Sequence, residues 1–180
     1  MAGKPPDGAK LYETALNHLA RYAATEAGLA RVLARKVDRW GRFSTDEGGE
    51  PEEIAAGVRQ AKTAIPGVIA RLKEAGVLND TAFAASRAKR LTREGKSRRA
   101  TLAHLAAKGV KAPHLPEDSE RELAAACAYL RRRRAGPFGD APELKILAAM
   151  ARGGFTQDVA RRALRLDRDE AEALIKGLHE

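Results

Sequence analysis

Few residues of this 180-residue chain have the types and spacing that support catalysis or metal binding. The single cysteine, Cys127, has no partner for a disulfide, and the four histidines are scattered without metal-ligand spacing. These histidines are His18, His104, His114 and His179. We find no Ser/His/Asp set and no isolated pair of carboxylates. The sequence therefore predicts no catalytic residue, no metal site and no cofactor.

One tripeptide imitates a nucleotide-binding motif. Gly95-Lys96-Ser97 has the residue types that end a P-loop. A P-loop also needs a glycine five residues before Gly95, where this chain has Arg90, and a preceding strand, which is not expected here. We interpret the tripeptide as a turn between two helices, in which Ser97 caps the second helix. Nucleotide hydrolysis at this turn is kept as a rival hypothesis.

Positive charge is concentrated between Thr81 and Lys111. This segment holds nine Lys or Arg and one acid, Glu94, so it carries +8 of the formal net charge of +9. Its bases are Arg87, Lys89, Arg90, Arg93, Lys96, Arg98, Arg99, Lys108 and Lys111. The rest of the chain has 24 bases and 23 acids, which nearly cancel. A charge run is usually a solvated helix face, but the near absence of acids here favours an anionic partner.

Two of these bases stand at an expected helix start. Arg98 and Arg99 follow Ser97, and the helix dipole disfavours cations at that position, which suggests a role in binding. Backbone N–H groups at the same helix start would add to phosphate binding. Secondary basic patches are predicted from Arg131, Arg132, Arg133, Arg134, Arg161, Arg162 and Arg165.

Composition favours helix over sheet. Alanine and leucine dominate, aromatic residues make up 4%, and β-branched runs are scarce. No apolar run approaches the roughly 20 residues that a membrane span needs, and the N-terminus lacks the apolar core of a signal peptide. A single cysteine fits a reducing compartment. We therefore expect an all-α, soluble, cytoplasmic monomer that does not bind membranes.

The apolar pattern predicts a succession of amphipathic helices. One covers about 9–24, and Thr25 caps the next. Residues 38–49 are expected to form a loop, in which Trp40 and Phe43 either cover a satellite core or present a ring for stacking on a base or a partner. The helix over 50–75 contains Pro66, but its apolar stripe stays in phase, which favours one kinked helix over two. Later helices are expected over about 80–94, 97–108, 117–134, 142–152 and 156–166, with Leu144 inward, Cys127 buried and Asp80 as a cap. Thr156 is expected to cap the last of these helices, which the tail over 167–180 can extend.

Three nine-residue segments resemble one another. They are 29–37, 102–110 and 147–155, and each begins with leucine, has a large apolar residue fourth and ends on an apolar residue. Such a repeat indicates stacked helical units that bury a core against their neighbours. We predict a disordered start over 1–9 and three units over 10–78, 79–116 and 117–180, the first with an inserted loop and a long helix and the second being the basic one.

Several runs between residues 71 and 164 resemble a known protein family. The similarity rests on the run Arg71-Leu-Lys-Glu-Ala-Gly-Val-Leu-Asn-Asp-Thr-Ala-Phe-Ala84, on Arg93-Glu-Gly-Lys-Ser-Arg-Arg99 and on the segment ending in Ala-Lys-Gly-Val110. Further along, 131–138 and 151–164 agree as well. These residues look like the RecX family, regulators of the bacterial recombinase RecA. The resemblance covers roughly residues 11–166, although Asn79 stands where the family usually has Asp, Arg87 replaces a commonly aromatic or apolar residue, and prolines interrupt the second unit near 113–116.

The resemblance implies three tandem three-helix, helix-turn-helix-like units in an elongated, curved array. It also implies binding to the RecA–single-stranded DNA filament, with inhibition of its extension, its ATPase and its strand exchange in DNA repair and the SOS response. The basic segment would then provide the main contacts, to DNA phosphates or to acidic RecA residues. The alternative is a stand-alone helical DNA-binding protein that acts without RecA.

Overall fold

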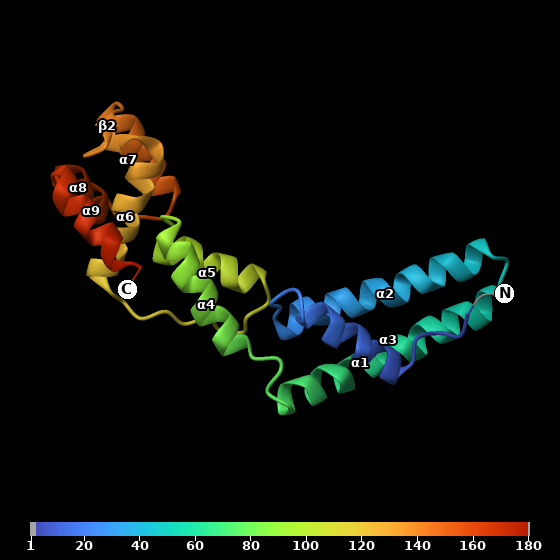
Figure 1. The fold of residues 1–180 in the computed structure, drawn as a ribbon. Coiled ribbons are helices and arrows are strands. Elements are labelled where there is room, and N and C mark those ends of the chain that lie inside the picture. Colours follow the sequence, from blue (N-terminus) through green and yellow to red (C-terminus); the bar gives the residue numbers. More distant parts are fainter. Residues whose placement is uncertain (1–2, 180) are drawn as a thin grey trace. The chain divides into compact units, whose positions relative to one another are not determined.

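The computed structural model describes residues 3–179, and within them it contains nine α-helices and one two-stranded sheet (Figure 1). The all-α prediction is confirmed. The chain forms two compact units. Unit 1 comprises the described residues up to Phe83 together with Lys108–Val110. Unit 2 comprises Ala84–Ala107 and the described residues from Lys111 onward.

Unit 1 is built on a pair of long helices. Helix α2 (Glu26–Asp46) and helix α3 (Pro51–Glu74) lie side by side, and the shorter α1 (Gly8–Leu19) packs on both (Figure 1). Their contact faces form one apolar core. That core includes Leu11, Ala15, Leu29, Leu33, Val37, Ala61, Ile65, Val68, Ile69, Leu72 and Leu78. Helix spacing of these apolar residues therefore produces the unit as the sequence indicated.

The loop expected over 38–49 is wrong, because α2 continues to Asp46. Val37, Gly41 and Ser44 extend the buried face of α2 at helical spacing. A Cβ at Gly41 would lie 2.9 Å from a methyl group of Val58 on α3, so glycine allows close helix contact here. Gly41 is therefore explained by close packing of two helices and not by a loop.

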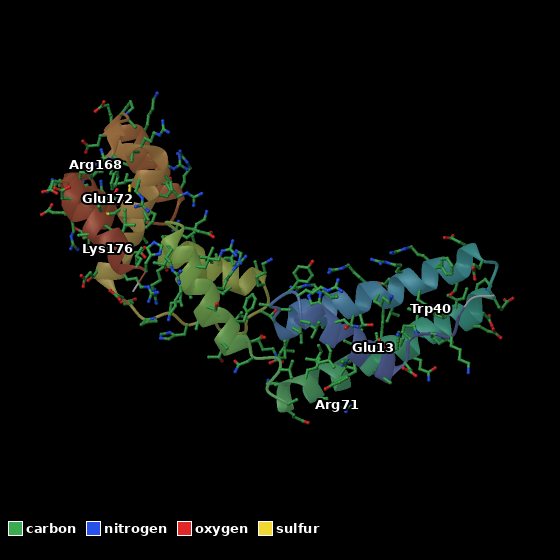
Figure 2. The ribbon with its side chains drawn as sticks, viewed as in Figure 1. Glu13, Trp40, Arg71, Arg168, Glu172 and Lys176 are labelled. Carbon is green, nitrogen blue, oxygen red and sulfur yellow. The ribbon has the colours of Figure 1, made fainter. Side chains whose placement is uncertain are left out.

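The two aromatic residues of this stretch have different environments. The indole of Trp40 donates a hydrogen bond of 2.8 Å to the carbonyl of Gly3. A Cβ at Gly57 would lie 2.9 Å from the Trp40 ring, so this ring packs closely on α3. Phe43, by contrast, is 57% exposed. Of the two alternatives predicted for these rings, packing against the protein therefore holds for Trp40 and not for Phe43. Figure 2 marks Trp40 beside helices α2 and α3.

Helix α3 runs without interruption through Pro66, which confirms one helix over this region. Pro51 lies in its first turn, where the missing N–H costs no helical hydrogen bond. Gly76 follows the helix with φ +69°, as expected for the residue after a helix end. At the other end of the unit, α1 begins at Gly8, within the stretch expected to be disordered.

Side-chain hydrogen bonds fix the start of α2. Thr25 caps the helix as predicted, since its hydroxyl oxygen accepts from the Gly28 N–H and also donates to the carbonyl of Lys108. Helix α4 (Asp80–Arg93) begins differently from the prediction. Asn79 accepts the Ala82 N–H and is its cap, whereas Asp80 accepts the backbone N–H of Glu26 at 2.7 Å. Asp80 therefore stabilises the start of α2 rather than its own helix.

Unit 2 is arranged around helix α6 (Ser119–Arg133), which packs against α8 (Gln157–Arg165) and α9 (Arg168–Gly177). Six consecutive residues of α6, 123–128, are buried, and four of them are alanine. Small side chains let neighbouring elements cover this helix on several sides. The unit also contains α5 (Arg98–Ala107) and α7 (Glu143–Arg152). Strands β1 (Ala135–Gly136) and β2 (Gly139–Asp140) pair antiparallel, with Ala135 opposite Asp140.

The C-terminal region differs from the prediction in two places. Residues after 166 do not extend α8, because Asp167 begins a separate helix, α9, through a reciprocal capping box with Glu170. Leu144, expected inward, is 84% exposed. Ile146 and Met150 are buried instead, since their four-residue spacing places them on the face of α7 that meets the core.

The described part of the chain contains no helix long and apolar enough to cross a membrane. The division into three tandem three-helix units, with boundaries at 10–78, 79–116 and 117–180, stays a prediction.

Two glycines that end helices provide a matched test of backbone packing. Gly76 after α3 and Gly95 after α4 have φ of +69° and +74°. A Cβ at Gly76 meets nothing within 4 Å, whereas one at Gly95 would lie 2.6 Å from the backbone nitrogen of Tyr129. We expect Gly76→Ala to cost about 1–2 kcal/mol, from left-handed strain alone. Gly95→Ala should lower the free energy of unfolding clearly further, as measured by urea denaturation. Equal losses in the two variants would contradict this close approach.

Candidate nucleic-acid interface

The turn between α4 and α5 presents part of the basic segment. Ser97 in this turn is fully buried and caps α5, because its hydroxyl oxygen accepts the Ala100 N–H. The same hydroxyl donates a 2.7 Å hydrogen bond to the carbonyl of Gly153, at the end of α7. The Ser97 cap is therefore confirmed. Nucleotide hydrolysis at 95–97 gains no support, because the serine hydroxyl that would face a nucleotide-bound metal is engaged inside unit 2.

Arg98 takes part in the packing of unit 2. Its backbone N–H donates to a carboxylate oxygen of Glu122 at 2.8 Å. Its guanidinium donates to the carbonyl of Leu115 at 3.0 Å and lies 3.6 Å from the carboxylate of Glu117. The start of α5 is thus already hydrogen-bonded by Glu122 and Ser97. The expectation of phosphate binding by the backbone N–H groups at this helix start does not fit these contacts.

Several other predicted binding residues have intramolecular partners. The Arg87 Nε donates to Nε2 of His104 at 3.1 Å, and Arg90 pairs with Glu94 at 2.8 Å. The next group lies on α6 and α8. Arg131 pairs with Glu172, Arg132 donates to the carbonyl of Glu94, Arg133 lies over the Tyr129 ring, and Arg162 lies 3.9 Å from Asp158. Exposed ion pairs of this kind are weak, so these residues are partly rather than fully committed.

The remaining predicted residues are exposed and have no side-chain hydrogen bond or ion pair with any residue between 3 and 179. They are Lys89, Arg93, Lys96, Arg99, Lys108, Arg134 and Arg161. Four of them belong to one stretch of unit 2, which covers the second half of α4, the turn after it and the start of α5. We call these four, Lys89, Arg93, Lys96 and Arg99, the α4–α5 basic set. An external anion would pair with them without breaking an existing contact.

Two members of this set border a cleft. Lys89 and Arg93 are one helical turn apart on α4 and line a space of about 800 Å³ shared with α6 and α9. Its apolar lining comes from Ala124, Ala173, Leu174 and Leu178. Three carboxylates also line it, and those of Asp118 and Glu170 take part in helix caps, whereas that of Glu120 has no hydrogen bond or ion pair among the residues described. The cleft therefore has a mixed character, with the positive charges of Lys89 and Arg93 on the α4 side and the negative charge of Glu120 on the α6 side.

The positive potential of this region is visible in one acidic residue. The hydrogen bond from Arg90 lowers the pKa of Glu94, and the charges of Arg87 and Arg132 lower it further. Burial, in contrast, raises the pKa of Glu122. Burial also raises the pKa of the Cys127 thiol to about 11, which confirms its interpretation as a buried apolar residue. Among the residues described, no cluster of three or more His, Cys, Asp or Glu could hold a metal ion.

Sequence reasoning located the charge and missed its internal partners. The pairs of Arg98 with Leu115 and of Arg132 with Glu94 join segments 17 and 38 residues apart, and no local pattern indicates them. The pair of Arg90 with Glu94 has the four-residue spacing of helical ion pairs and could have been found.

Comparison with known proteins gives one informative match. The chain is 36% identical over 166 residues to "Regulatory protein RecX" of Myxococcus xanthus (strain DK1622). The aligned region covers 86% of this chain and 83% of that protein. No family model matches the sequence, and no solved structure matches it.

The half-buried carboxyl of Glu122, which accepts the Arg98 N–H, makes the stability of the protein depend on pH. Its folded-state pKa is raised above the ordinary value of 4.5, so the folded protein holds this proton more tightly than the unfolded chain. The contribution of Glu122 to stability therefore falls as the pH rises from about 4.5 through the raised folded value. Glu122→Gln keeps an acceptor for the Arg98 N–H and removes the titration. We expect the free energy of unfolding of the variant, relative to the wild type, to rise across this pH window.

Urea denaturation at a series of pH values measures this difference. Glu120→Gln, which removes an exposed carboxyl from the same turn of α6, is the matched control for a change of one charge. A constant difference between wild type and Glu122→Gln at all pH values would contradict the half-buried, partly desolvated position of Glu122.

Proposed function

The chain belongs to the RecX family, and we propose that it is a non-enzymatic regulator that binds the RecA–single-stranded DNA filament. In this proposal the bound protein inhibits filament extension, ATP hydrolysis and strand exchange. The proposal takes its partner from the family and its contact residues from the structure. The single observation that carries it is the α4–α5 basic set, four uncommitted bases on adjacent elements.

Electrostatics supports an anionic partner at this set. Lys89 and Arg93 carry like charges one helical turn apart and therefore repel each other. Neither side chain pairs with a carboxylate among residues 3–179, so this repulsion is not compensated. An anion bound between them would relieve that repulsion. The phosphates of the single strand inside a filament offer such anions in a row, and acidic side chains of the recombinase offer them singly. Release of counterions from DNA would make the first kind of contact strongly dependent on salt.

The rigidity of the turn supports a role in positioning these bases. Gly95 approaches the backbone of Tyr129, and Ser97 is hydrogen-bonded to Gly153, so the α4–α5 turn is fixed to the core of unit 2. Lys96 directly precedes the buried Ser97 in this turn, and Arg99 lies two residues after it, in the first turn of α5. Bases on a fixed element lose less conformational freedom on binding than bases on a mobile loop.

We predict that replacing Lys89, Arg93, Lys96 and Arg99 together by glutamine reduces inhibition of RecA ATPase and strand exchange by at least tenfold. Each lost phosphate contact should also lower the salt dependence of binding to the filament. Arg98 is retained in this variant because its packing contacts would confound the result. Titration of the protein into RecA filaments on single-stranded DNA measures the effect.

The matched control replaces four exposed bases on other elements by glutamine, namely Arg59, Lys145, Arg152 and Lys176. This control removes the same net charge and should inhibit RecA like the wild type. Wild-type inhibition by the test variant would refute the assignment to the α4–α5 basic set. A wild-type protein that binds bare single-stranded DNA tightly and leaves RecA activity unchanged would support the stand-alone DNA-binding alternative instead.

A further inference from the structure

Helix α2 of unit 1 carries a second concentration of positive charge. Over its whole length it has five bases and three acids, and two of these acids, Glu26 and Asp46, are its first and last residues. Four of the bases are arginines at intervals of four, four and three residues, and we call them the α2 arginine row. They are Arg31, Arg35, Arg39 and Arg42. This spacing keeps all four on one face of the helix.

The row lies on the side of α2 away from the core. At 100° per residue, the arginines fall roughly opposite Leu29, Leu33 and Val37, which are fully buried. Successive arginines four residues apart are separated by about 6 Å along the axis. That separation is comparable to the distance between neighbouring phosphates of an extended single strand. All four arginines are exposed.

Two of the three acids of α2 pair with α3, whereas the third, Asp46, ends the helix one turn beyond Arg42 and makes no ion pair with any residue between 3 and 179. Asp38 pairs with Lys62 of α3 at 2.6 Å, and Glu26 pairs with Lys73 of α3 at 2.9 Å. Both pairs bridge α2 to α3. Within the described residues, the side chains of Arg35, Arg39 and Arg42 make no hydrogen bond or ion pair. Arg31 makes one long contact, 3.3 Å from its guanidinium to the carbonyl of Lys108. The row therefore presents like charges that repel one another, and none of the four arginines pairs with a carboxylate among the residues described.

An exposed aromatic ring borders the row. Phe43 is 57% exposed, follows Arg42 directly and lies about one turn beyond Arg39. A single exposed aromatic residue is ordinary on a protein surface, so its position beside the arginines is the informative point. The neighbouring Trp40 is packed on α3 and hydrogen-bonded, so of these two aromatic rings Phe43 is the exposed one. In proteins that bind single-stranded nucleic acid without sequence preference, aromatic rings beside Lys and Arg side chains stack on unpaired nucleobases.

We propose that the α2 arginine row and Phe43 form a binding site for single-stranded nucleic acid, separate from the α4–α5 basic set. The arginines contact successive phosphates, and Phe43 stacks on a base of the same strand. A single strand fits better than a duplex because duplex bases are stacked on one another and do not offer their faces. The proposal extends the proposed function, but its residues belong to unit 1 and its test does not need RecA.

Two sites on one chain have a consequence for binding strength. Once one site holds a strand, the other meets that strand at a high effective concentration, provided that the strand is long enough to reach both sites. We therefore expect the wild type to bind a long oligonucleotide more tightly than a short one by more than the ratio of their lengths. Loss of either site should remove this excess.

The test uses the full chain and fluorescein-labelled oligodeoxythymidylate, with binding followed by fluorescence anisotropy over a range of salt concentrations. The variant Arg35→Gln, Arg39→Gln, Arg42→Gln should bind at least tenfold more weakly at low salt. Its slope of log affinity against log salt should fall by about 2, since each phosphate contact to a single strand contributes about 0.7. The matched control is Arg59→Gln, Lys145→Gln, Lys176→Gln, which removes three exposed bases from other elements and should bind like the wild type.

A second variant tests stacking. Phe43→Ala should weaken binding about fivefold or more without changing the salt slope, because it removes a base contact and no charge. Leu144→Ala, which truncates a side chain that is 84% exposed on α7, is its control and should have no effect. Circular dichroism confirms that each variant keeps its helicity.

Each remaining outcome decides the proposal. Unchanged affinity and slope in the arginine variant, or no binding of the oligonucleotide by the wild type, would overturn it. A variant that binds bare oligonucleotide normally and loses only binding to the RecA filament would also overturn it, in favour of an acidic protein surface as the partner. The α4–α5 variant distinguishes the two proposals: normal inhibition by that variant refutes the proposed contact set and leaves the α2 site standing.

Discussion

The arrangement of the basic turn depends on two side-chain hydrogen bonds at the start of α5. Ser97 joins the α5 backbone to the end of α7, and Glu122 joins it to the first turn of α6. The carboxyl of Glu122 is partly desolvated for this purpose, and burial raises its pKa. The turn therefore cannot shift without breaking a contact to the core of unit 2. The basic residues of unit 2 then fall into two classes, those with contacts inside the unit and those that are exposed without a polar partner among the residues described.

Arg98 and Arg99 illustrate the difference between these classes. They are neighbours in sequence with the same side chain, but Arg98 reaches the carbonyl of Leu115 and Arg99 is exposed without a polar partner among the residues described. Substitution of both together would mix a loss of stability with a loss of binding. Arg98 therefore stabilises unit 2, whereas Arg99 is available to an external anion.

Local signals predicted most of the helices, and they failed where long-range packing decided the outcome. Thr25, Ser97 and Thr156 could be identified as caps because a cap needs only its own helix. The continuation of α2 beyond Val37 could not, because Gly41 is tolerated through its contact with Val58 of α3. Charge counting had a similar limit. Acids and bases outside 81–111 nearly cancel in sequence, but Asp38 and Glu26 pair toward α3 and leave the α2 arginines uncompensated on the opposite side.

The hydrogen bond of Trp40 gives unit 1 an optical reporter. Trp40 is the only tryptophan of the chain, and its indole binds the carbonyl of Gly3 while its ring covers Gly57. Its emission therefore responds to the docking of the N-terminal segment on the α2–α3 pair and carries no contribution from unit 2. Far-ultraviolet circular dichroism, in contrast, averages over all the helices. Unfolding curves recorded by these two signals coincide only if both units unfold in one transition, so one residue is sufficient to measure their cooperativity.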